Sequence, residues 1–269
     1  MATTEHGPDR SRDVQAGALT SVADWDPYYE GLDLDRIDSL SRGPSVFDEY
    51  LSGRTGCVFE LGCGGSPLLA RGARFGWQVA GVDFSAPSLA CLQRYLAQQQ
   101  LPAGRFILGD IFTADVASFA ESADMIVSAG FLEHFENPTP ILKKWSAVLR
   151  PGGLVVSAIP NLLGINAKVF AKYDVPFWRQ HVAFDPAALD RMHVDAGLQI
   201  ARQAAYVGRY DIHMLVPWKN IARRFPHPQL YRFFKLATYF GIGVPLSKLP
   251  LSPSKRFSPY VLGVYKKTG

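Results

Sequence analysis

Short apolar runs alternate with helix-like stretches along residues 57–159 of the chain. This alternation is typical of a parallel β-sheet covered by helices, because one parallel strand reaches the next through a crossing connection that is usually helical. The apolar runs predict five short strands, at residues 57–61, 78–83, 105–108, 124–128 and 154–159.

Two of the stretches between these runs carry helix signals. Residues 85–98 open with Ser85, a capping residue, and a proline follows that the first helical turn tolerates. Leu89, Leu92 and Leu96 then recur at helical spacing. Residues 140–149 behave likewise and end at the sequence RPGG, which predicts a helix stop and a turn before the next strand.

The segments outside this core predict further elements. A polar stretch at the N-terminus precedes the aromatic cluster WDPYY at 25–29, which we interpret as a tail followed by a helical cap. After the core, the pattern predicts a helix at 185–196 and strands at 198–206 and 260–265. We therefore divide the chain into a tail and cap (1–55), a core (56–206) with an insertion at 162–180, a lid insertion (207–259) and a final core strand (260–269).

Composition disfavours several classes of protein. The chain has 269 residues, of which 48% are hydrophobic and 19% charged, so disorder, collagen and coiled coils are disfavoured. No apolar run reaches about 18 residues and the N-terminus is polar, which predicts neither a membrane span nor a signal peptide. Three cysteines are too few for a disulfide framework or a zinc cluster, and a cytoplasmic location is expected.

Charge is distributed unevenly along the chain. Asp211 is the last acidic residue, and ten Lys or Arg follow it. The chain up to that point holds 18 basic and 24 acidic residues, so a net charge of −6 is followed by one of +10. The basic segment is either a solvated face or a surface for an anionic lipid, a phosphorylated substrate or a nucleic acid.

The loop after the first strand carries the most informative motif. Residues 58–66 read VFELGCGGS, in which a strand ends in an acid, Gly62 and Gly64 follow two apart and a helix begins. Glycines let a ligand lie close against the main chain, which suits a nucleotide. The dinucleotide fingerprint fails because Pro67 stands where its third glycine belongs, and the mononucleotide phosphate loop fails because no Gly-Lys-Ser or Gly-Lys-Thr follows.

Two more acids end the next two strands. Asp83 stands 21 residues after Gly62, where a carboxylate accepts hydrogen bonds from ribose hydroxyls. Asp110 follows the third strand, where it would accept from an adenine amine while Ile111 and Phe112 flank the ring. Either acid alone is more often a cap or turn residue. Three acids that end three successive strands meet, however, at the edge where open α/β sheets bind ligands.

Together, these motifs resemble those of the class I S-adenosylmethionine-dependent methyltransferases. The matching runs are ELGCG at 60–64, VD at 82–83, GD at 109–110, DMIVSAGFLEH at 124–134, LRPGG at 149–153 and PN at 160–161. The likeness is close over 59–161 and looser over 181–200, where HVAF and DAGL resemble small-molecule members such as the quinol O-methyltransferases. It implies a Rossmann-like α/β fold with a seven-stranded mixed sheet. It also implies S-adenosylmethionine as the cofactor and S-adenosylhomocysteine as its product.

The resemblance implies roles for individual residues. Gly62 and Gly64 would receive the methionine part of the cofactor, while Glu60 orders the glycine loop. The family's frequent third glycine is Ser66 here, preceded by an extra Gly65, so we expect a slightly different loop shape. The other implied cofactor contacts are Asp83 at the ribose, Asp110 with Ile111 at the adenine, Ser128 and Ala129 beside the sulfonium, and Phe84.

Two histidines are the candidate catalytic residues. Methyl transfer from a sulfonium requires mainly alignment, and a base is needed only where the acceptor must lose a proton. His181, in the segment expected to cover the acceptor, is the preferred base, and His134 is the alternative, although Glu133 and His134 are equally well interpreted as a structural pair. No metal ligand set is predicted. The residues expected to contact the acceptor are Tyr28, Tyr29, Phe131, Phe177, Trp178, Tyr206, Tyr210 and His213.

The two insertions, 162–180 and 207–259, are apolar and aromatic, and additions of this kind choose the acceptor. Nearly every position of the helix-like stretch 229–240 is apolar except Arg232, Lys235 and Thr238. This helix is a packed cap, a homodimer interface, a lid over a lipophilic acceptor or, through 218–240, a contact with an anionic membrane. We expect these segments to supply aromatic walls to the acceptor pocket.

The sequence as a whole predicts methyl transfer to oxygen, nitrogen or carbon of a small, hydrophobic or aromatic metabolite. Three alternatives remain open: a lipid-modifying enzyme of the cyclopropanating or prenyl-lipid-methylating kind, a cofactor-binding scaffold without activity, and a nucleic-acid methyltransferase. The basic C-terminal segment raises the last of these. A nucleic-acid partner is disfavoured because the sequence contains no recognisable RNA- or DNA-binding module.

Overall fold

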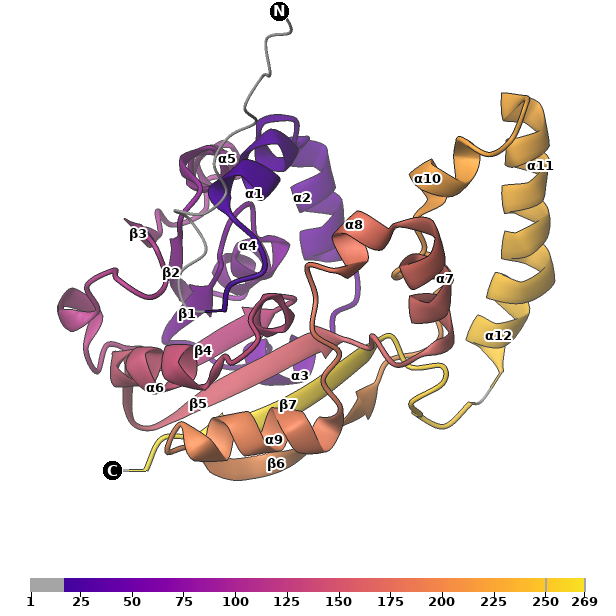
Figure 1. The fold of residues 1–269 in the computed structure, drawn as a ribbon. Helices are drawn as coiled ribbons and strands as arrows, with labels where there is room; N and C mark the ends of the chain where they lie inside the picture. Colours follow the sequence, from indigo (N-terminus) through magenta and orange to yellow (C-terminus); the bar gives the residue numbers. More distant parts are fainter. Residues whose placement is uncertain (1–16, 250, 269) are drawn as a thin grey trace, which may run out of the picture.

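The predicted sheet forms the centre of the molecule in the computed structural model, which describes residues 17–249 and 251–268 except for the side chain of Tyr28 (Figure 1). All five strands predicted for the core are present, and two more complete the sheet. The strands are β1 (Cys57–Leu61), β2 (Gln78–Asp83), β3 (Arg105–Leu108), β4 (Ala123–Ala129), β5 (Leu149–Pro160), β6 (Gln199–Val207) and β7 (Tyr260–Lys266).

The strands lie in the order β3-β2-β1-β4-β5-β7-β6. Strands β1 to β5 are parallel, whereas β7 lies antiparallel between β5 and β6. The predicted seven-stranded mixed sheet is thereby confirmed. Because the chain passes back across β1 between β3 and β4, the strand order reverses there. Open α/β sheets bind their ligands at the carboxyl ends of the strands beside such a reversal.

Helices cover both faces of the sheet (Figure 1). One hydrophobic core joins the sheet to α2 (Leu34–Arg42), α4 (Pro67–Arg74) and α5 (Ala86–Gln98), and the other joins it to α6 (Thr139–Trp145) and α9 (Pro186–Asp195). The helix predicted at 85–98 is confirmed as α5. Ser66 and Ser85 cap α4 and α5, each with a proline in the first turn, which fixes where both helices begin.

The turn predicted at 150–153 is wrong. Helix α6 ends at Trp145, a 3-10 turn, η3 (Ser146–Val148), follows, and β5 already begins at Leu149. The N–H of Gly152 donates to the carbonyl of Lys267 at 3.0 Å, and the N–H of Lys267 donates to the carbonyl of Gly153 at 2.9 Å. Pairing with the far end of the chain therefore draws a local turn sequence into the sheet.

Between residue 17 and the first strand, the structure contains three helices: α1 (Val22–Glu30), α2 and α3 (Asp48–Leu51). Helix α1 carries the predicted aromatic cluster at 25–29 and packs on α5. The N–H of Leu19 donates to the carbonyl of His134 at 2.8 Å, so the entry to α1 is fastened to the loop after β4. The polar tail expected at the start of the chain lies within residues 1–16, which are outside the described residues.

The second insertion forms a separate group of helices, which we call the C-terminal lobe: α10 (Trp218–Ala222), α11 (Pro228–Thr238), the π-helical η4 (Tyr239–Gly243) and α12 (Val244–Lys248). The helix predicted at 229–240 is confirmed by α11 and η4. Helices α7 (Ile165–Tyr173) and α8 (Val175–Trp178) lie between this lobe and the rest of the molecule, and α11 stands farthest from the sheet (Figure 1). Among the described residues, no helix is both long and apolar enough to cross a membrane.

Candidate active site

A cavity of about 670 Å³ lies where the carboxyl ends of β1, β2 and β4 face α1 and α2. Its volume is typical of small-molecule sites, which measure about 300–1,000 Å³. Eight of the nine expected cofactor contacts line it: Glu60, Gly62, Gly64, Asp83, Phe84, Asp110, Ile111 and Ala129. The opposite wall comes from α1, α2 and the turn between them, through Trp25, Tyr29, Leu32, Arg36 and Leu40.

The glycine loop leaves no room for side chains. Gly62 has a left-handed backbone with φ of +69°, and a Cβ on it would lie 2.4 Å from the ring of Phe131. A Cβ on Gly64 would lie 2.5 Å from Ser88 Oγ and 2.8 Å from Asp83 Oδ2. Atoms in contact are normally about 3.5–4.0 Å apart, so the main chain itself forms this wall of the cavity. The loop offers the cradle that the methionine part of the expected cofactor requires.

Asp83 ties this loop to the start of α5. Its Oδ2 accepts from the N–H of Gly64 at 2.8 Å, and its Oδ1 accepts from the N–H of Ser85 at 2.8 Å and from Ser88 Oγ at 3.0 Å. Burial raises the pKa of Asp83, while these hydrogen bonds act in the opposite direction. A carboxylate accepts about four hydrogen bonds, so Oδ2 retains a lone pair for a ribose hydroxyl.

Asp110 is oriented by the turn that follows it. Its Oδ1 accepts from the N–H groups of Phe112 and Thr113, at 2.7 and 3.3 Å, which leaves Oδ2 for a ligand amine. Trp145 fixes the next residue, because its indole N–H donates to the carbonyl of Ile111 at 2.8 Å. Ile111 and Phe112 both line the cavity beside this carboxylate, which gives the expected adenine an apolar slot with one polar end.

Glu60 acts within the protein. Its Oε2 accepts from Ser66 Oγ at 2.5 Å, and Ser66 in turn accepts from the N–H groups that open α4. Burial raises the pKa of Glu60 to about 8. The carboxyl group therefore fixes the end of the glycine loop, and Ser66, which replaces the expected third glycine, is part of the same connection.

One end of the cavity is apolar and aromatic, and it adjoins the glycine loop, because the Phe131 ring lies beside Gly62. Ala129 at the end of β4, Phe131 and His134 line it together with Trp25 and Tyr29 of α1. The rings of Trp25 and His134 meet edge to face at 5.4 Å between centroids. This is the end at which an acceptor would lie. Ser128, expected beside the sulfonium, is fully buried behind Ala129 and does not line the cavity.

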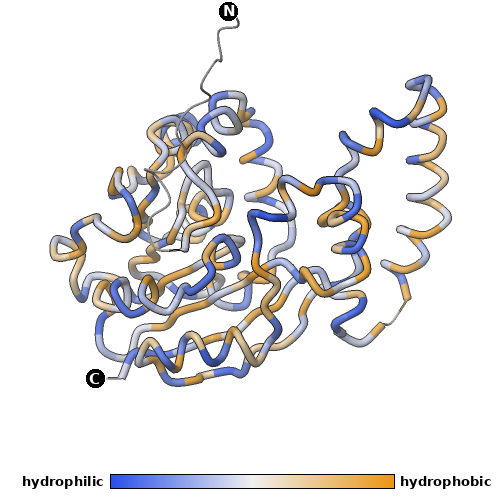
Figure 2. The backbone as a smooth tube through the Cα atoms, viewed as in Figure 1, coloured by the Kyte–Doolittle hydropathy of each residue, from blue (hydrophilic) through white to orange (hydrophobic). Residues whose placement is uncertain are grey.

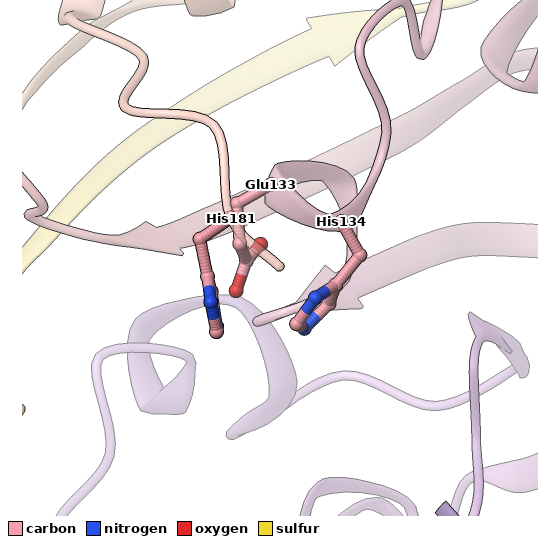
Figure 3. Close-up of side chains that lie close together, drawn as sticks. All are labelled: Glu133, His134 and His181. Atoms are coloured by element: carbon pink, nitrogen blue, oxygen red, sulfur yellow. The ribbon is translucent and has the colours of Figure 1, made fainter. Parts of the chain in front are cut away.

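Both candidate bases lie side by side with Glu133 (Figure 3). The rings of His134 and His181 are 4.4 Å apart between centroids. His134 Nδ1 lies 2.9 Å from the carbonyl oxygen of Gln180, and His181 Nδ1 lies 2.7 Å from that of Phe177. Carbonyl oxygens only accept, so both Nδ1 atoms carry the hydrogen and both Nε2 atoms keep a lone pair.

Burial sets the charge of this cluster. It raises the pKa of Glu133 to about 8 and lowers the pKa of His134 to about 4, and it also lowers the pKa of His181. Within the described part of the chain, Glu133 Oε2 has no hydrogen-bond partner. The neutral imidazole of His134 keeps one lone pair on Nε2, so it can accept a proton from a ligand hydroxyl.

Glu133, His134 and His181 also offer one ligand atom each within 4.8 Å of one another. Two imidazoles and a carboxylate are donors that a divalent cation accepts, and backbone carbonyls hold both imidazoles as outer partners commonly do at metal sites. The sequence predicted no such set, because residues 133–134 and 181 are far apart along the chain. Two hydrogen bonds join the segments: the N–H of Val182 donates to the carbonyl of Glu133 at 2.7 Å, and His134 Nδ1 donates to the carbonyl of Gln180 at 2.9 Å.

Several residues expected at the acceptor lie elsewhere. The predicted aromatic walls from the insertions are wrong for the cavity described above, because α1 and α2 occupy that position. Phe177 packs on His181 at 4.7 Å between centroids and Trp178 packs on Phe170, and neither Phe177 nor Trp178 lines the cavity. Neither His181 itself nor Tyr206, Tyr210 and His213 are among the lining residues, and the side chain of Tyr28 is not described. Acceptor contact by these residues stays a prediction.

The sequence pattern missed Arg36 and Leu40, which α2 brings to the cavity. Helix α2 has a clear cap, because Asp33 Oδ1 accepts from the N–H of Asp35 at 3.0 Å. An acid that begins a helix with apolar residues at helical spacing was therefore the available signal. Trp25, also on the wall, belongs to the aromatic cluster that the sequence did single out.

Known proteins share this sequence pattern. A family model described as "Methyltransferase domain" matches residues 59–157. The ubiquinone biosynthesis O-methyltransferase of Idiomarina loihiensis is 31% identical over 186 residues, which cover 65% of this chain and 74% of that protein. The ubiquinone biosynthesis O-methyltransferase of Xanthomonas axonopodis pv. citri is 29% identical with the same two coverages.

Solved structures share the fold. The Haemonchus contortus phosphoethanolamine N-methyltransferase 2, in complex with phosphomonomethylethanolamine and S-adenosylhomocysteine, matches with a TM-score of 0.59 and 12% identity, covering 94% of this chain and 60% of that one. The magnesium protoporphyrin IX methyltransferase of Synechocystis PCC 6803, with bound S-adenosylhomocysteine, has a TM-score of 0.50 at 14% identity, covering 87% and 83%. Identities this low show the fold alone.

Proposed function

This chain belongs to the class I S-adenosylmethionine-dependent methyltransferases, and we propose that it methylates a hydroxyl group of a small, lipophilic aromatic acceptor. The observation that carries the proposal is the imidazole of His134, which lines the aromatic part of the cavity and has Glu133 and His181 beside it. A base is useful only to an acceptor that loses a proton, which favours a hydroxyl group. The names of the O-methyltransferase relatives agree with this choice.

The residues of the sheet edge fit the cofactor. S-adenosylmethionine supplies a methyl group already activated by a positively charged sulfur, and S-adenosylhomocysteine is the product. We propose that Gly62 and Gly64 hold the methionine part, that Asp83 accepts from the ribose hydroxyls and that Asp110 accepts from the adenine amine. The glycine cradle, the spare lone pair of Asp83 and the unused Oδ2 of Asp110 support these roles.

His134 is the proposed first proton acceptor, because it lines the cavity and its Nε2 lone pair is available. As the hydroxyl O–H breaks, an N–H forms on Nε2, and the Gln180 carbonyl that already accepts from Nδ1 steadies the resulting imidazolium. His181 is the proposed next acceptor, since its ring lies against His134 and is less buried. Phe170 and Phe177 pack on His181 and hold its ring in place.

The acceptor is proposed to be lipophilic because the walls available to it are apolar. Trp25, Tyr29 and Phe131 offer ring faces, and Leu32 and Leu40 complete that side of the cavity. A cytoplasmic place of action is also proposed, which the three free thiols Cys57, Cys63 and Cys91 support.

The experiment measures S-adenosylhomocysteine release with a panel of alkylated catechols and hydroquinones. We expect His134→Ala to lower turnover about a hundredfold or more, and His181→Ala to lower it less, because general-base catalysis contributes roughly 10²–10⁴-fold. Calorimetric affinity for S-adenosylmethionine should change less than about twofold, because neither imidazole belongs to the glycine loop or to the adenine slot. His227→Ala, an exposed histidine outside the site, is the control. Unchanged turnover in both variants would contradict the base.

A further inference from the structure

One face of α11 and of the following η4 exposes an unusual run of large apolar side chains, which we call the apolar crest: Leu230, Phe233, Leu236 and Phe240. Their exposed fractions are 50%, 74%, 56% and 64%. Spacings of three and four residues place them on one side of the helix. Figure 2 shows apolar positions recurring along α11, far from the sheet. Monomeric proteins rarely leave a contiguous patch of this kind uncovered.

The opposite face of α11 makes the contacts of this helix with the rest of the lobe, although Phe234 on that face is still 41% exposed. Tyr231 and Phe234 contact Phe225, with ring centroids 5.8 and 5.1 Å apart. The ammonium group of Lys235 lies 5.7 Å from the centroid of the Trp218 ring. Since this face already supplies the internal contacts of the lobe, the apolar crest is turned away from the rest of the chain. The crest is therefore available to a partner outside the chain.

The charge of the lobe limits what that partner can be. Its bases include Lys219, Arg223, Arg224, Arg232 and Lys248, and every charged residue after Asp211 is basic. Arg232 is exposed on α11 itself, between the crest and the packed face. A second copy docked crest to crest would bring two basic surfaces together, which like-charge repulsion disfavours. A partner that is both apolar and anionic complements the crest and its surrounding bases.

We propose that the apolar crest docks on the surface of an anionic lipid bilayer. The exposed rings and leucines enter the boundary between headgroups and acyl chains, while the surrounding Arg and Lys side chains bind acidic headgroups. The docking is peripheral, with α11 lying in the plane of the surface. This inference does not depend on the proposed acceptor, although a lipophilic acceptor would reach the enzyme from the same bilayer.

The experiment uses the full chain and vesicles of phosphatidylcholine with or without phosphatidylglycerol, scored by flotation. We expect binding to the anionic vesicles to exceed binding to the neutral ones by about tenfold or more, and to weaken in high salt. The double variant F233S/F240S should lose at least about tenfold in binding to the anionic vesicles. The matched control V194S/I200S removes apolar side chains that are 48% and 41% exposed on α9 and β6, and it should bind as the unaltered chain does.

A second pair of substitutions separates charge from hydrophobicity. R232E/K248E keeps the apolar crest and reverses two exposed bases, so it should lose the preference for phosphatidylglycerol while keeping weak binding to both vesicles. Calorimetric affinity for S-adenosylmethionine, unchanged in all variants, verifies folding. The proposal is overturned if the unaltered chain does not float with anionic vesicles, if F233S/F240S binds as V194S/I200S does, or if ultracentrifugation shows a dimer that only F233S/F240S abolishes.

Discussion

The carboxyl edge of the sheet and the C-terminal lobe differ in which side chains they bury and which they expose. At the edge, polar groups are buried and tied to neighbours a few residues away, as Asp83 is to Ser85 and Ser88 and Glu60 is to Ser66. In the lobe, Phe233 and its neighbours are apolar and exposed. Local hydrogen bonds fix the polar groups of the edge in place, which suits one defined ligand, whereas the lobe exposes an apolar surface that we propose a partner covers. The comparison predicts that substitutions at the edge act on cofactor affinity and those elsewhere leave it unchanged.

Gly64→Ala should have the largest effect, because it places a Cβ 2.5 Å from Ser88 Oγ and 2.8 Å from Asp83 Oδ2. Either the loop or Asp83 must move, and a displacement of about an ångström in a positioning element costs roughly a hundredfold. We expect calorimetric affinity for S-adenosylmethionine to fall about a hundredfold. The control is Gly241→Ala in the lobe, where an added Cβ meets nothing within 4 Å. Equal affinity in the two variants would break the comparison.

Asp110→Asn should have a smaller effect at the same edge. An Asn oxygen still accepts from the N–H of Phe112, so the turn persists, but an amide NH₂ replaces the Oδ2 that we propose accepts from the adenine amine. We expect affinity for S-adenosylhomocysteine to fall about tenfold. The inosine analogue of that product carries a carbonyl in place of the amine, and the variant should bind it better than the unaltered chain does. Loss of affinity for both compounds would show that the turn, and not the amine contact, had failed.

The sequence predicted the residues of the sheet edge better than those of the acceptor side. Gly62, Gly64 and Asp83 act through contacts made within a strand, a loop and the next helix, so their spacing alone predicted their place on the cavity. His181 meets His134 only after α7 and α8 have folded back over the loop that follows β4. No local pattern records that contact.

The acceptor side shows the limit most clearly. Tyr206, at the end of the predicted core, and Tyr210 and His213, in the second insertion, were expected to contact the acceptor. Tyr210 instead lies in the core with its hydroxyl donating to Asn166 at 2.9 Å, and His213 packs on Tyr239 within the lobe. Hydrophobicity predicted that these residues would pack. The surface against which they pack depends on how the second insertion, residues 207–259, folds. The sequence also did not show that α1 and α2 cover the cavity.

Glu133→Gln should change how the stability of the protein depends on pH. The expected change in melting temperature is a few degrees. Burial raises the pKa of Glu133 from 4.5 to about 8, so the folded chain holds this proton where the unfolded chain has lost it. Its contribution to the free energy of unfolding is therefore greatest below pH 4.5 and declines as the pH rises to about 8. His134 titrates lower and with the opposite sign, which leaves pH 6.5 to 8 as the clean window.

In that window, the melting temperature of the unaltered chain should fall by roughly 5 °C relative to that of Glu133→Gln. Glu136→Gln, at an exposed carboxylate of the same loop, is the control and should follow the unaltered chain. Parallel melting curves for all three proteins would show that Glu133 does not hold a proton in the fold. The cluster would then carry a buried negative charge that needs a different partner.

Removal of metal ions should leave turnover unchanged, which is the smallest of the expected effects. Metal ligands must be deprotonated, and burial raises the pKa of Glu133 to about 8, so metal binding at neutral pH would have to displace the proton of this carboxyl group. We expect less than one metal ion per chain by elemental analysis, and turnover unchanged within about twofold after dialysis against a chelator. One tightly held ion per chain, lost in Glu133→Gln and His181→Ala together with turnover, would contradict this. The acceptor end would then resemble the sheet edge, because its charged side chains would bind one ligand. The assignment of His134 as the base would have to be withdrawn.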